Sequence, residues 1–348
     1  MEFWLPGILI LLALVLSGLP IAFAMGLVGF GGLTAIIGMD AAFSMVAQVT
    51  FDTGMSYTLS VVPLFILMGN FVTAAGLSDE LYAASNAWLG HRRGGLAMAT
   101  AAACGGFSAV CGSSLATAAT MSKVAMPSMR RYGYADSLAT GVIAAGGTLG
   151  ILIPPSVILV IYGIMAQQDI GKLFAAGIIP GILGVLGYMA AVRVVTAIKP
   201  ELGRPAERLP YAERFRALKG LWGVIGLFAL VIGGIYLGVF TATEAAGVGA
   251  AGAFFFALFR RALSWTKLKQ VLEESAATTA MMFVILIGAL IFGAALSLTT
   301  ALQVAGSNIP TDVIQMLPFA AVMLVLVLFG RRAKLPSALG AAYERGAR

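Results

Sequence analysis

The chain has 348 residues, of which 60% are hydrophobic and only 11% are charged, and its formal net charge is +7. Its mean hydropathy is +0.96. Soluble domains carry about 25% charged residues, so this composition excludes a water-soluble globular protein. The basic residues fall in short loops, as in the cytoplasmic loops of membrane proteins, and they predict no nucleic-acid partner. We therefore expect an all-α integral membrane protein that crosses the lipid bilayer several times.

Long uncharged stretches separate the charged clusters. An apolar helix of about 20 residues spans the hydrocarbon core of a bilayer. Several stretches are long enough to cross the membrane, or to enter it and return. The uncharged stretches are residues 3–39, 94–122, 137–168, 220–243 and 275–311.

Residues 94–126 are predicted to form a re-entrant hairpin. Basic pairs flank the stretch, at residues 92–93 and 130–131. Because positively charged loops face the cytoplasm, both ends of the stretch should lie on the same side of the membrane. The small residues Gly112-Ser113-Ser114 are the expected tip of this hairpin.

Residues 137–168 are predicted to form a broken helix. The stretch contains Gly146-Gly147-Thr148-Leu149-Gly150 and, a few residues later, Pro154-Pro155-Ser156. Two adjacent prolines remove two backbone donors and clash with the preceding turn. The helix should therefore unwind near the prolines.

The domain organisation follows from these segments and from one polar loop. Residues 1–197 are interpreted as a first transport repeat, and residues 198–219 as a cytoplasmic linker rich in Lys and Arg. Residues 220–300 are interpreted as a partial second repeat. Residues 301–348 should supply a final transmembrane helix and a basic cytoplasmic tail.

The two breaks form the candidate binding site. Non-helical backbone at membrane depth occurs where it is buried or lines a cavity, and transporters bind ions and substrates at such breaks. Neither break contains an acidic residue, so carbonyl and hydroxyl oxygens favour a monovalent ion over calcium or zinc. The alternative is that these small residues only allow helices to pack closely. The candidate substrate- and ion-binding residues are Gly112, Ser113, Ser114, Thr117, Gly147, Thr148, Gly150, Pro154, Pro155 and Ser156, with sodium held by Ser113, Ser114, Gly147 and Thr148.

The second half offers one further pair of candidates, Thr243 and Glu244. Glu244 is the only acid between Glu213 and Glu273, and an acid inside the membrane is a functional candidate by default. The alternative is a structural role at a helix N-terminus, where the helix dipole favours a negative charge.

These motifs resemble the large membrane subunit of tripartite ATP-independent periplasmic (TRAP) transporters. The resemblance covers about residues 1–300 and rests first on the hairpin tip and on the segment from Gly147 to Ser156. Other segments that share it are Val62-Pro63-Leu64-Phe65-Ile66, Arg131-Tyr132-Gly133-Tyr134, Gly171-Lys172-Leu173-Phe174 and Thr243-Glu244-Ala245-Ala246.

The resemblance implies a sodium-coupled secondary importer of organic acids, such as dicarboxylates or sialic-acid-like substrates. It implies elevator-like transport across the bacterial inner membrane, with sodium as the coupling ion and no other cofactor. A small TRAP membrane subunit and a periplasmic solute-binding protein are the implied partners. By the family's pattern, the hairpin tip and the helix break form the first sodium site and one wall of the substrate site.

The second half departs from that pattern. The family's second half is an inverted repeat with its own hairpin and proline break, and residues 220–300 contain neither. We therefore expect an inverted-repeat transporter fold with an incomplete second half. Residues 301–348 instead resemble the C-terminus of the membrane permease of ABC importers for nucleosides and simple sugars, at Met316-Leu317-Pro318-Phe319 and Phe329-Gly330-Arg331-Arg332.

Three functions therefore remain open at this point. The leading one is the permease of a sodium-coupled importer; the others are an ABC-type nucleoside or sugar permease and an incomplete, non-transporting membrane protein. Sodium dependence without ATP would separate the first two. An enzyme is not expected, because the sequence has no His/Cys/Asp cluster, no Gly-x-Ser-x-Gly motif and no phosphate-binding loop.

Overall fold

The structure is a computed structural model that describes residues 4–304. Every regular element in this range is a helix, and the described residues contain no strand. The predicted all-α fold is therefore confirmed. Contacts divide the chain into two compact units, Tyr57–Thr279 and a second unit made of residues up to Ser56 and residues from Ala280 onward. The tail predicted for residues 301–348 lies almost entirely outside the described residues.

The unit that contains the N-terminus consists of α1 (Trp4–Leu16), α2 (Ile21–Ile37), α3 (Met39–Gly54) and the later part of α15 (Trp265–Val304). The uncharged stretch 3–39 is thus two main helices, separated at Gly18, whose φ is 94°, and at Pro20, which precedes α2.

Glycines allow α2 and α15 to pack backbone to backbone. A Cβ on Gly29 would lie 2.7 Å from the Phe292 backbone, and a Cβ on Gly288 would lie 2.3 Å from the Ala22 carbonyl oxygen. Small residues permit such close approach of membrane helices, whose association depends on packing because lipid supplies no hydrophobic drive.

The larger unit begins with η1 (Thr58–Ser60), α4 (Val61–Ala74) and α5 (Leu77–Leu89). Helices α6 (Gly95–Cys111) and α7 (Ser114–Arg131) follow and form a helix-turn-helix pair. Nearly all residues of α6 are buried, because α4, α5, α7, α8 and α11 all pack around it. Helix α6 is therefore the central helix of this unit.

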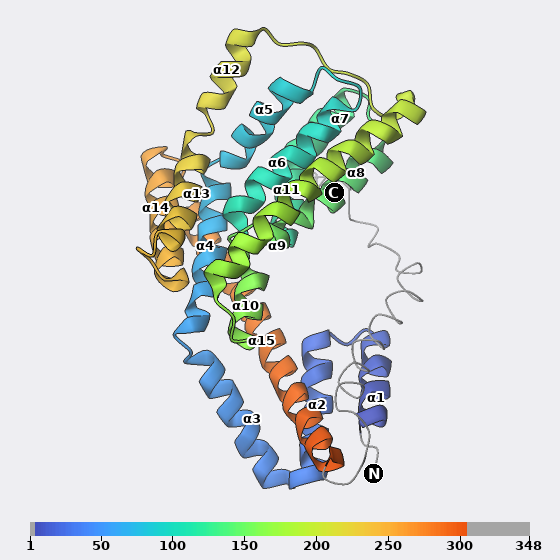
Figure 1. Cartoon of the computed structure of the whole chain (residues 1–348), viewed down its shortest axis with the longest axis vertical. Coiled ribbons are helices and arrows are strands. Elements are labelled where there is room, and N and C mark those ends of the chain that lie inside the picture. Colours follow the sequence, from blue (N-terminus) through green and yellow to red (C-terminus); the bar gives the residue numbers. More distant parts are fainter. Residues whose placement is uncertain (1–3, 305–348) are drawn as a thin grey trace. The chain divides into compact units, whose positions relative to one another are not determined.

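The chain then breaks within the next long apolar stretch. Helices α8 (Asp136–Gly147) and α9 (Leu149–Leu152) are followed by four non-helical residues and α10 (Val157–Met165), with a bend of 40°. Helix α11 (Ile170–Ile198) then runs along α6, as Figure 1 shows.

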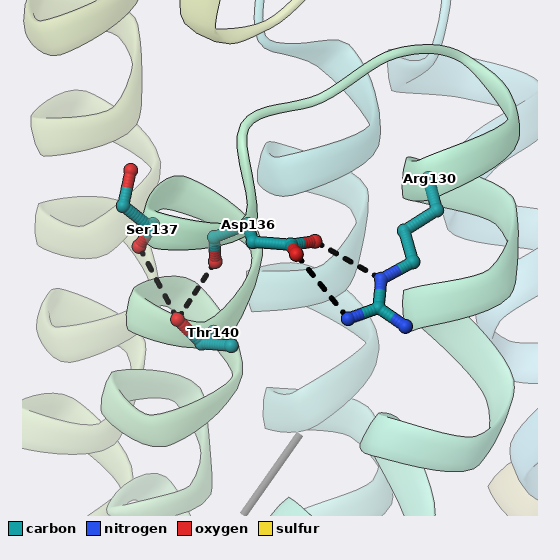
Figure 2. A network of polar contacts seen from close by, with 4 residues as sticks. All are labelled: Arg130, Asp136, Ser137 and Thr140. Carbon is teal, nitrogen blue, oxygen red and sulfur yellow. Dashed lines mark hydrogen bonds and ion pairs between the residues drawn. The ribbon is translucent and has the colours of Figure 1, made fainter. Parts of the chain in front are cut away.

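A polar network closes the turn between α7 and α8. Arg130 donates two hydrogen bonds to the Asp136 carboxylate, of 3.0 and 3.3 Å. The Thr140 hydroxyl donates to the backbone carbonyl of Asp136 at 2.7 Å. Figure 2 shows Arg130 reaching across from the end of α7 to the start of α8. This ion pair links the two helices outside the apolar core.

The linker region contains η2 (Pro200–Leu202) and α12 (Tyr211–Lys219), and it leads into α13 (Trp222–Tyr236) and α14 (Ala242–Phe259). The linker packs onto the preceding helices. Gly94 donates to the Gly203 carbonyl at 3.1 Å, and Ala206 donates to the Gly90 carbonyl at 2.9 Å. Its backbone is therefore anchored to the turn between α5 and α6.

Within residues 4–304, three helices are long and apolar enough to cross a membrane: α11, α14 and the stretch Trp265–Leu298 of α15. The number of candidate spans among the described residues rises to six if each bent helix pair counts as one. Helix lengths and composition thus agree with a multi-pass membrane protein.

Candidate functional site

The turn between α6 and α7 is the first half of the candidate site. Helix α6 ends at Cys111, and Gly112 follows with a left-handed φ of 65°. Glycine adopts this conformation without the steric cost that a Cβ brings. Ser113 is the N-cap of α7, and its hydroxyl accepts a 3.4 Å hydrogen bond from the Ala116 N–H. The turn is therefore tight and capped.

The segment between α9 and α10 is the second half. Ile153 is extended, the two prolines follow, and Ser156 is the N-cap of α10. The buried Ser156 hydroxyl donates to the Ile151 carbonyl at 2.7 Å and accepts from the Leu159 N–H at 3.3 Å. Ser156 thus holds the ends of α9 and α10 together across the break.

The two halves touch through glycines. A Cβ on Gly112 would lie 2.6 Å from the Pro155 carbonyl oxygen, and the Gly112 carbonyl accepts a 3.3 Å hydrogen bond from the Val157 N–H. A Cβ on Gly150 would lie 2.6 Å from the carbonyl of Ser113. A larger residue at either glycine would push the hairpin tip away from the break.

Gly147 makes a further contact with the start of α7. A Cβ on Gly147 would lie 2.8 Å from the Ala118 Cβ and 3.2 Å from the Ser114 carbonyl oxygen. Six of the sequence-predicted residues therefore lie together: Gly112, Ser113, Ser114, Gly147, Gly150 and Pro155. Ser156 adjoins this group through Pro155.

Four helix ends meet at these contacts. The C-terminal ends of α6 and α9 bring partly negative carbonyls, and the N-terminal ends of α7 and α10 bring partly positive N–H groups. A cation is stabilised near helix C-termini and an anion near N-termini. The junction therefore offers favourable surroundings to both a cation and a carboxylate.

Three hydroxyl oxygens near the hairpin tip are buried and have no hydrogen-bond partner within the described part of the chain. They belong to Ser108, Ser114 and Thr117, and the side chains of Ser108 and Thr117 are fully buried. Leaving a buried polar group unsatisfied costs about 1–3 kcal/mol. A bound cation would remove this cost, which makes these oxygens candidate cation ligands.

Ser108 was not among the residues predicted from the sequence. It lies on the last turn of α6, and the Gly112 N–H donates to its carbonyl at 3.2 Å. Its position four residues before Gly112 was the available signal, because residues separated by three or four positions share one helix face.

Two predicted residues face α11 instead of the hairpin tip. The Thr148 hydroxyl donates to the Ala145 carbonyl at 2.7 Å and lies 2.8 Å from the Tyr188 hydroxyl of α11. Pro154 lies against Gly177 of the same helix, where a Cβ would be 3.5 Å from the proline Cδ. No sequence pattern predicted that Tyr188 would lie beside the break.

Thr243 and Glu244 lie in the first turn of α14. The Glu244 carboxylate accepts hydrogen bonds from the Thr241 N–H at 2.8 Å and from the Thr241 hydroxyl at 2.9 Å. The Thr241 hydroxyl in turn accepts from the Glu244 N–H at 3.3 Å, which completes a capping box. This arrangement matches the structural alternative considered for Glu244.

Among residues 4–304, no group of three or more His, Cys, Asp or Glu side chains could hold a metal ion. The oxygen atoms at the junction of the two breaks are carbonyls and hydroxyls. Such a neutral oxygen set suits a weakly held monovalent cation better than a transition metal, which prefers imidazole or thiolate ligands.

Comparison with known proteins decides the family. Residues 8–332 match the family described as the tripartite ATP-independent periplasmic transporter, DctM component. The chain belongs to this family. The match extends past residue 300, where the predicted resemblance ended, and covers much of the segment that resembles an ABC permease. It supports the TRAP interpretation and gives the ABC alternative no support.

Three named relatives are between 32% and 40% identical to this TRAP chain over the aligned residues. A C4-dicarboxylate TRAP transporter large permease protein of Pseudomonas aeruginosa is 40% identical over 265 residues, covering 75% of this chain and 61% of its own length. A sialic acid TRAP transporter large permease protein of Vibrio cholerae is 32% identical, covering 81% and 65%. An ectoine TRAP transporter large permease protein of Halomonas elongata is 33% identical, covering 79% and 64%. The chain thus spans about two thirds or less of these relatives.

Proposed function

We propose that this chain acts as the large permease subunit of a sodium-coupled secondary importer that moves organic acids across the bacterial inner membrane. The observation that carries the proposal is the contact of the hairpin tip with the helix break, through Gly112 and Gly150. Discontinuous helices that meet in this way place carbonyls toward coupling ions and N-termini toward anionic groups of the substrate.

The proposed ion is sodium, bound by carbonyl and hydroxyl oxygens of the tip. Ser114 and Thr117 are the best side-chain ligands, because their buried hydroxyl oxygens lack partners in the described structure; Ser108 joins them. Ser113 and Gly147 contribute through the backbone at the contact itself. Thr148 is assigned to positioning the break against α11 through Tyr188.

The proposed substrates are organic acids such as dicarboxylates or sialic-acid-like compounds. A carboxylate would be received by the N-terminal ends of α7 and α10. The related permeases carry the names of C4-dicarboxylate, sialic acid and ectoine, so family membership alone leaves several substrate classes open. We propose no enzymatic activity for this chain.

The proposed partners are a small TRAP membrane subunit and a periplasmic solute-binding protein, as the family implies. The movement would be elevator-like, with the hairpin tip and the break travelling together. The tight contact between them supports such movement, because a pair joined by backbone packing moves as one body.

The first test is the melting temperature of the purified protein in detergent. It is measured in sodium chloride and in potassium or choline chloride at equal ionic strength. A ligand that binds only the folded protein stabilises it by about 2.7 kcal/mol at a hundredfold excess over its Kd. We expect a saturable rise in melting temperature that is specific for sodium.

Single substitutions at the hairpin tip test where the sodium ion binds. Ser114→Ala and Thr117→Val should weaken or abolish the sodium-specific rise. Ser122→Ala is the control, because its hydroxyl is on the same helix and donates to the Ala118 carbonyl at 2.7 Å in an exposed position; it should keep the full rise. Equal melting temperatures in all three salts would contradict a sodium site and favour an incomplete, non-transporting protein.

A further inference from the structure

A buried arginine marks a second site, on the polar side of the larger unit. Arg214 is only 4% exposed, although most of its neighbours on α12 are exposed. Its Nε donates to the Leu209 carbonyl at 2.9 Å. Its Nη2 is buried and has no hydrogen-bond partner, and no ion pair joins Arg214 to a carboxylate within residues 4–304. A buried charge without a counter-charge is costly.

Aromatic rings hold this guanidinium in place. Its central carbon lies 5.9 Å from the centroid of the Trp88 ring and 5.1 Å from that of Tyr211. Trp88 belongs to α5 and also meets Phe215 of α12 edge to face, at 5.6 Å between ring centroids. These contacts stabilise a cation, but they give the N–H groups of Nη2 no acceptor within the described residues, so that nitrogen is available to bind an anion.

Besides Nη2 of Arg214, two ring nitrogens near it are buried without a hydrogen-bond partner in the described structure. They are Nε1 of Trp88 and Nδ1 of His91. His91 lies in the turn between α5 and α6, and its pKa is below the ordinary value because of burial and of the nearby charges of Arg214, Arg208 and Arg92. Positive charge and the unpartnered nitrogens of Arg214, Trp88 and His91 therefore gather where α12 packs on α5 and on the turn after it, and we call this region the seam.

The seam is built on a fixed backbone. The carbonyl of Gly90 accepts from the Ala206 N–H at 2.9 Å, and the Gly94 N–H donates to the Gly203 carbonyl at 3.1 Å. Helix α12 packs on α5, and Figure 1 shows it near the upper end of that helix. The backbone around these nitrogens is thus held in place before any ligand arrives, which lowers the entropic cost of binding.

The surroundings of the seam fit a lipid surface. Tyr211, Phe215 and Trp222 are 60%, 57% and 65% exposed, next to the exposed basic residues Arg216 and Lys219. Helix α12 leads with a bend of 42° into the apolar α13. A basic helix with exposed aromatic side chains lies in the membrane interface and is attracted to anionic lipids. The acids Glu207 and Glu213 are exposed and do not pair with Arg214 in the described structure.

We propose that the seam between α5 and α12 binds the phosphate of an anionic phospholipid headgroup, with Nη2 of Arg214 as the central donor and Trp88 and His91 beside it. Arg208 and Arg92 supply further positive charge, and the exposed aromatic side chains of α12 meet the acyl chains. This site is separate from the ion site at the hairpin tip and does not depend on sodium coupling.

The test uses the full chain in detergent, with melting temperature and native mass spectrometry as readouts. Phosphatidylglycerol, phosphatidylcholine and inorganic phosphate are titrated separately. We expect phosphatidylglycerol to raise the melting temperature saturably and to remain bound in the gas phase, with at least about tenfold higher affinity than phosphatidylcholine. Saturation by inorganic phosphate at the same concentrations would overturn the assignment to lipid, and no response to phosphatidylglycerol would overturn the site.

Matched variants test whether the lipid binds specifically at Arg214 or is only attracted by the positive charge of the surface. Arg214→Gln should lower the affinity for phosphatidylglycerol at least about tenfold, whereas Arg216→Gln, which removes the same charge from an exposed position, should change it less than about twofold. Trp88→Phe keeps an aromatic ring at this position but removes the indole N–H donor, and it should weaken binding severalfold even if Arg214→Gln fails to fold. Equal effects of the Arg214 and Arg216 variants, or unchanged binding by Trp88→Phe, would overturn the proposed geometry.

Discussion

Gly150 lies directly against the backbone of Ser113, and a Cβ on Gly150 would be 2.6 Å from the Ser113 carbonyl oxygen. Real Cβ atoms do not approach backbone so closely, so Gly150→Ala must separate the hairpin tip from the break. Overpacking of this kind costs about 1–3 kcal/mol. We expect a lower melting temperature and loss of the sodium-specific rise.

Gly141→Ala is the control for that variant. Gly141 lies in α8, and a Cβ there would meet nothing within 4 Å. Alanine is favoured over glycine inside a helix by up to about 1 kcal/mol, so this variant should be neutral or slightly stabilising and should keep the response to sodium. A normal sodium response in Gly150→Ala would show that the close contact is not needed for ion binding.

A partly buried ion pair joins α5 to the end of α14. Arg260 pairs with Glu80, and their side chains are 33% and 25% exposed. Arg260 also donates to the Ala75 carbonyl at 3.2 Å. Arg260→Met would leave the Glu80 carboxylate without its partner, and an unsatisfied buried group costs about 1–3 kcal/mol. The free energy of unfolding in detergent should fall by this amount.

An exposed pair provides the comparison. Lys269 and Glu273 lie 3.6 Å apart on α15, with side chains 71% and 66% exposed. Because water screens such pairs, they contribute about 0–1 kcal/mol. Lys269→Met should therefore change the free energy of unfolding much less than Arg260→Met. Equal losses in the two variants would mean that burial of the Glu80 pair has no energetic consequence.

The pair of Arg130 and Asp136 should act mainly at low salt. The hydrogen bond and the charge of Asp136 raise the pKa of the Arg130 guanidinium, and both side chains are well exposed, at 42% and 62%. Asp136→Asn should lower the melting temperature slightly in about 20 mM potassium chloride and not measurably in about 500 mM, because salt screens exposed charges. An effect that does not depend on salt would indicate a packing role.

His91 should make stability depend on pH. Its pKa is lowered by burial and by Arg214, Arg208 and Arg92, so the unfolded chain takes up a proton more readily than the folded one. The resulting stability is present above the ordinary pKa and is lost as the pH falls through the lowered pKa. From about pH 7.5 to about pH 5, the melting temperature should fall more for the wild type than for His91→Gln. Equal falls would exclude this contribution.

Local chemistry explains why much of the site was predictable. Pro154 and Pro155 interrupt helical hydrogen bonding wherever they stand, and Gly112 permits the left-handed turn that ends α6. The long uncharged stretches predicted helices because only apolar helices of that length suit a bilayer. The partner of an individual side chain could not be predicted in this way. Thr148 contacts Tyr188, which lies 40 residues further along the chain, and no local pattern links the two positions.

The sequence by itself determined the all-α membrane fold, the positions of the two breaks and the family, because these depend on composition, on proline and glycine, and on motif order. Only the tertiary structure decided which groups meet. Within the described residues, it placed Gly150 against Ser113, left the hydroxyl oxygens of Ser108 and Thr117 buried without hydrogen-bond partners, and buried Arg214 beside Trp88 and Tyr211. The physical reason is that burial and hydrogen bonding at these sites depend on helices distant in sequence, whose packing no local pattern encodes.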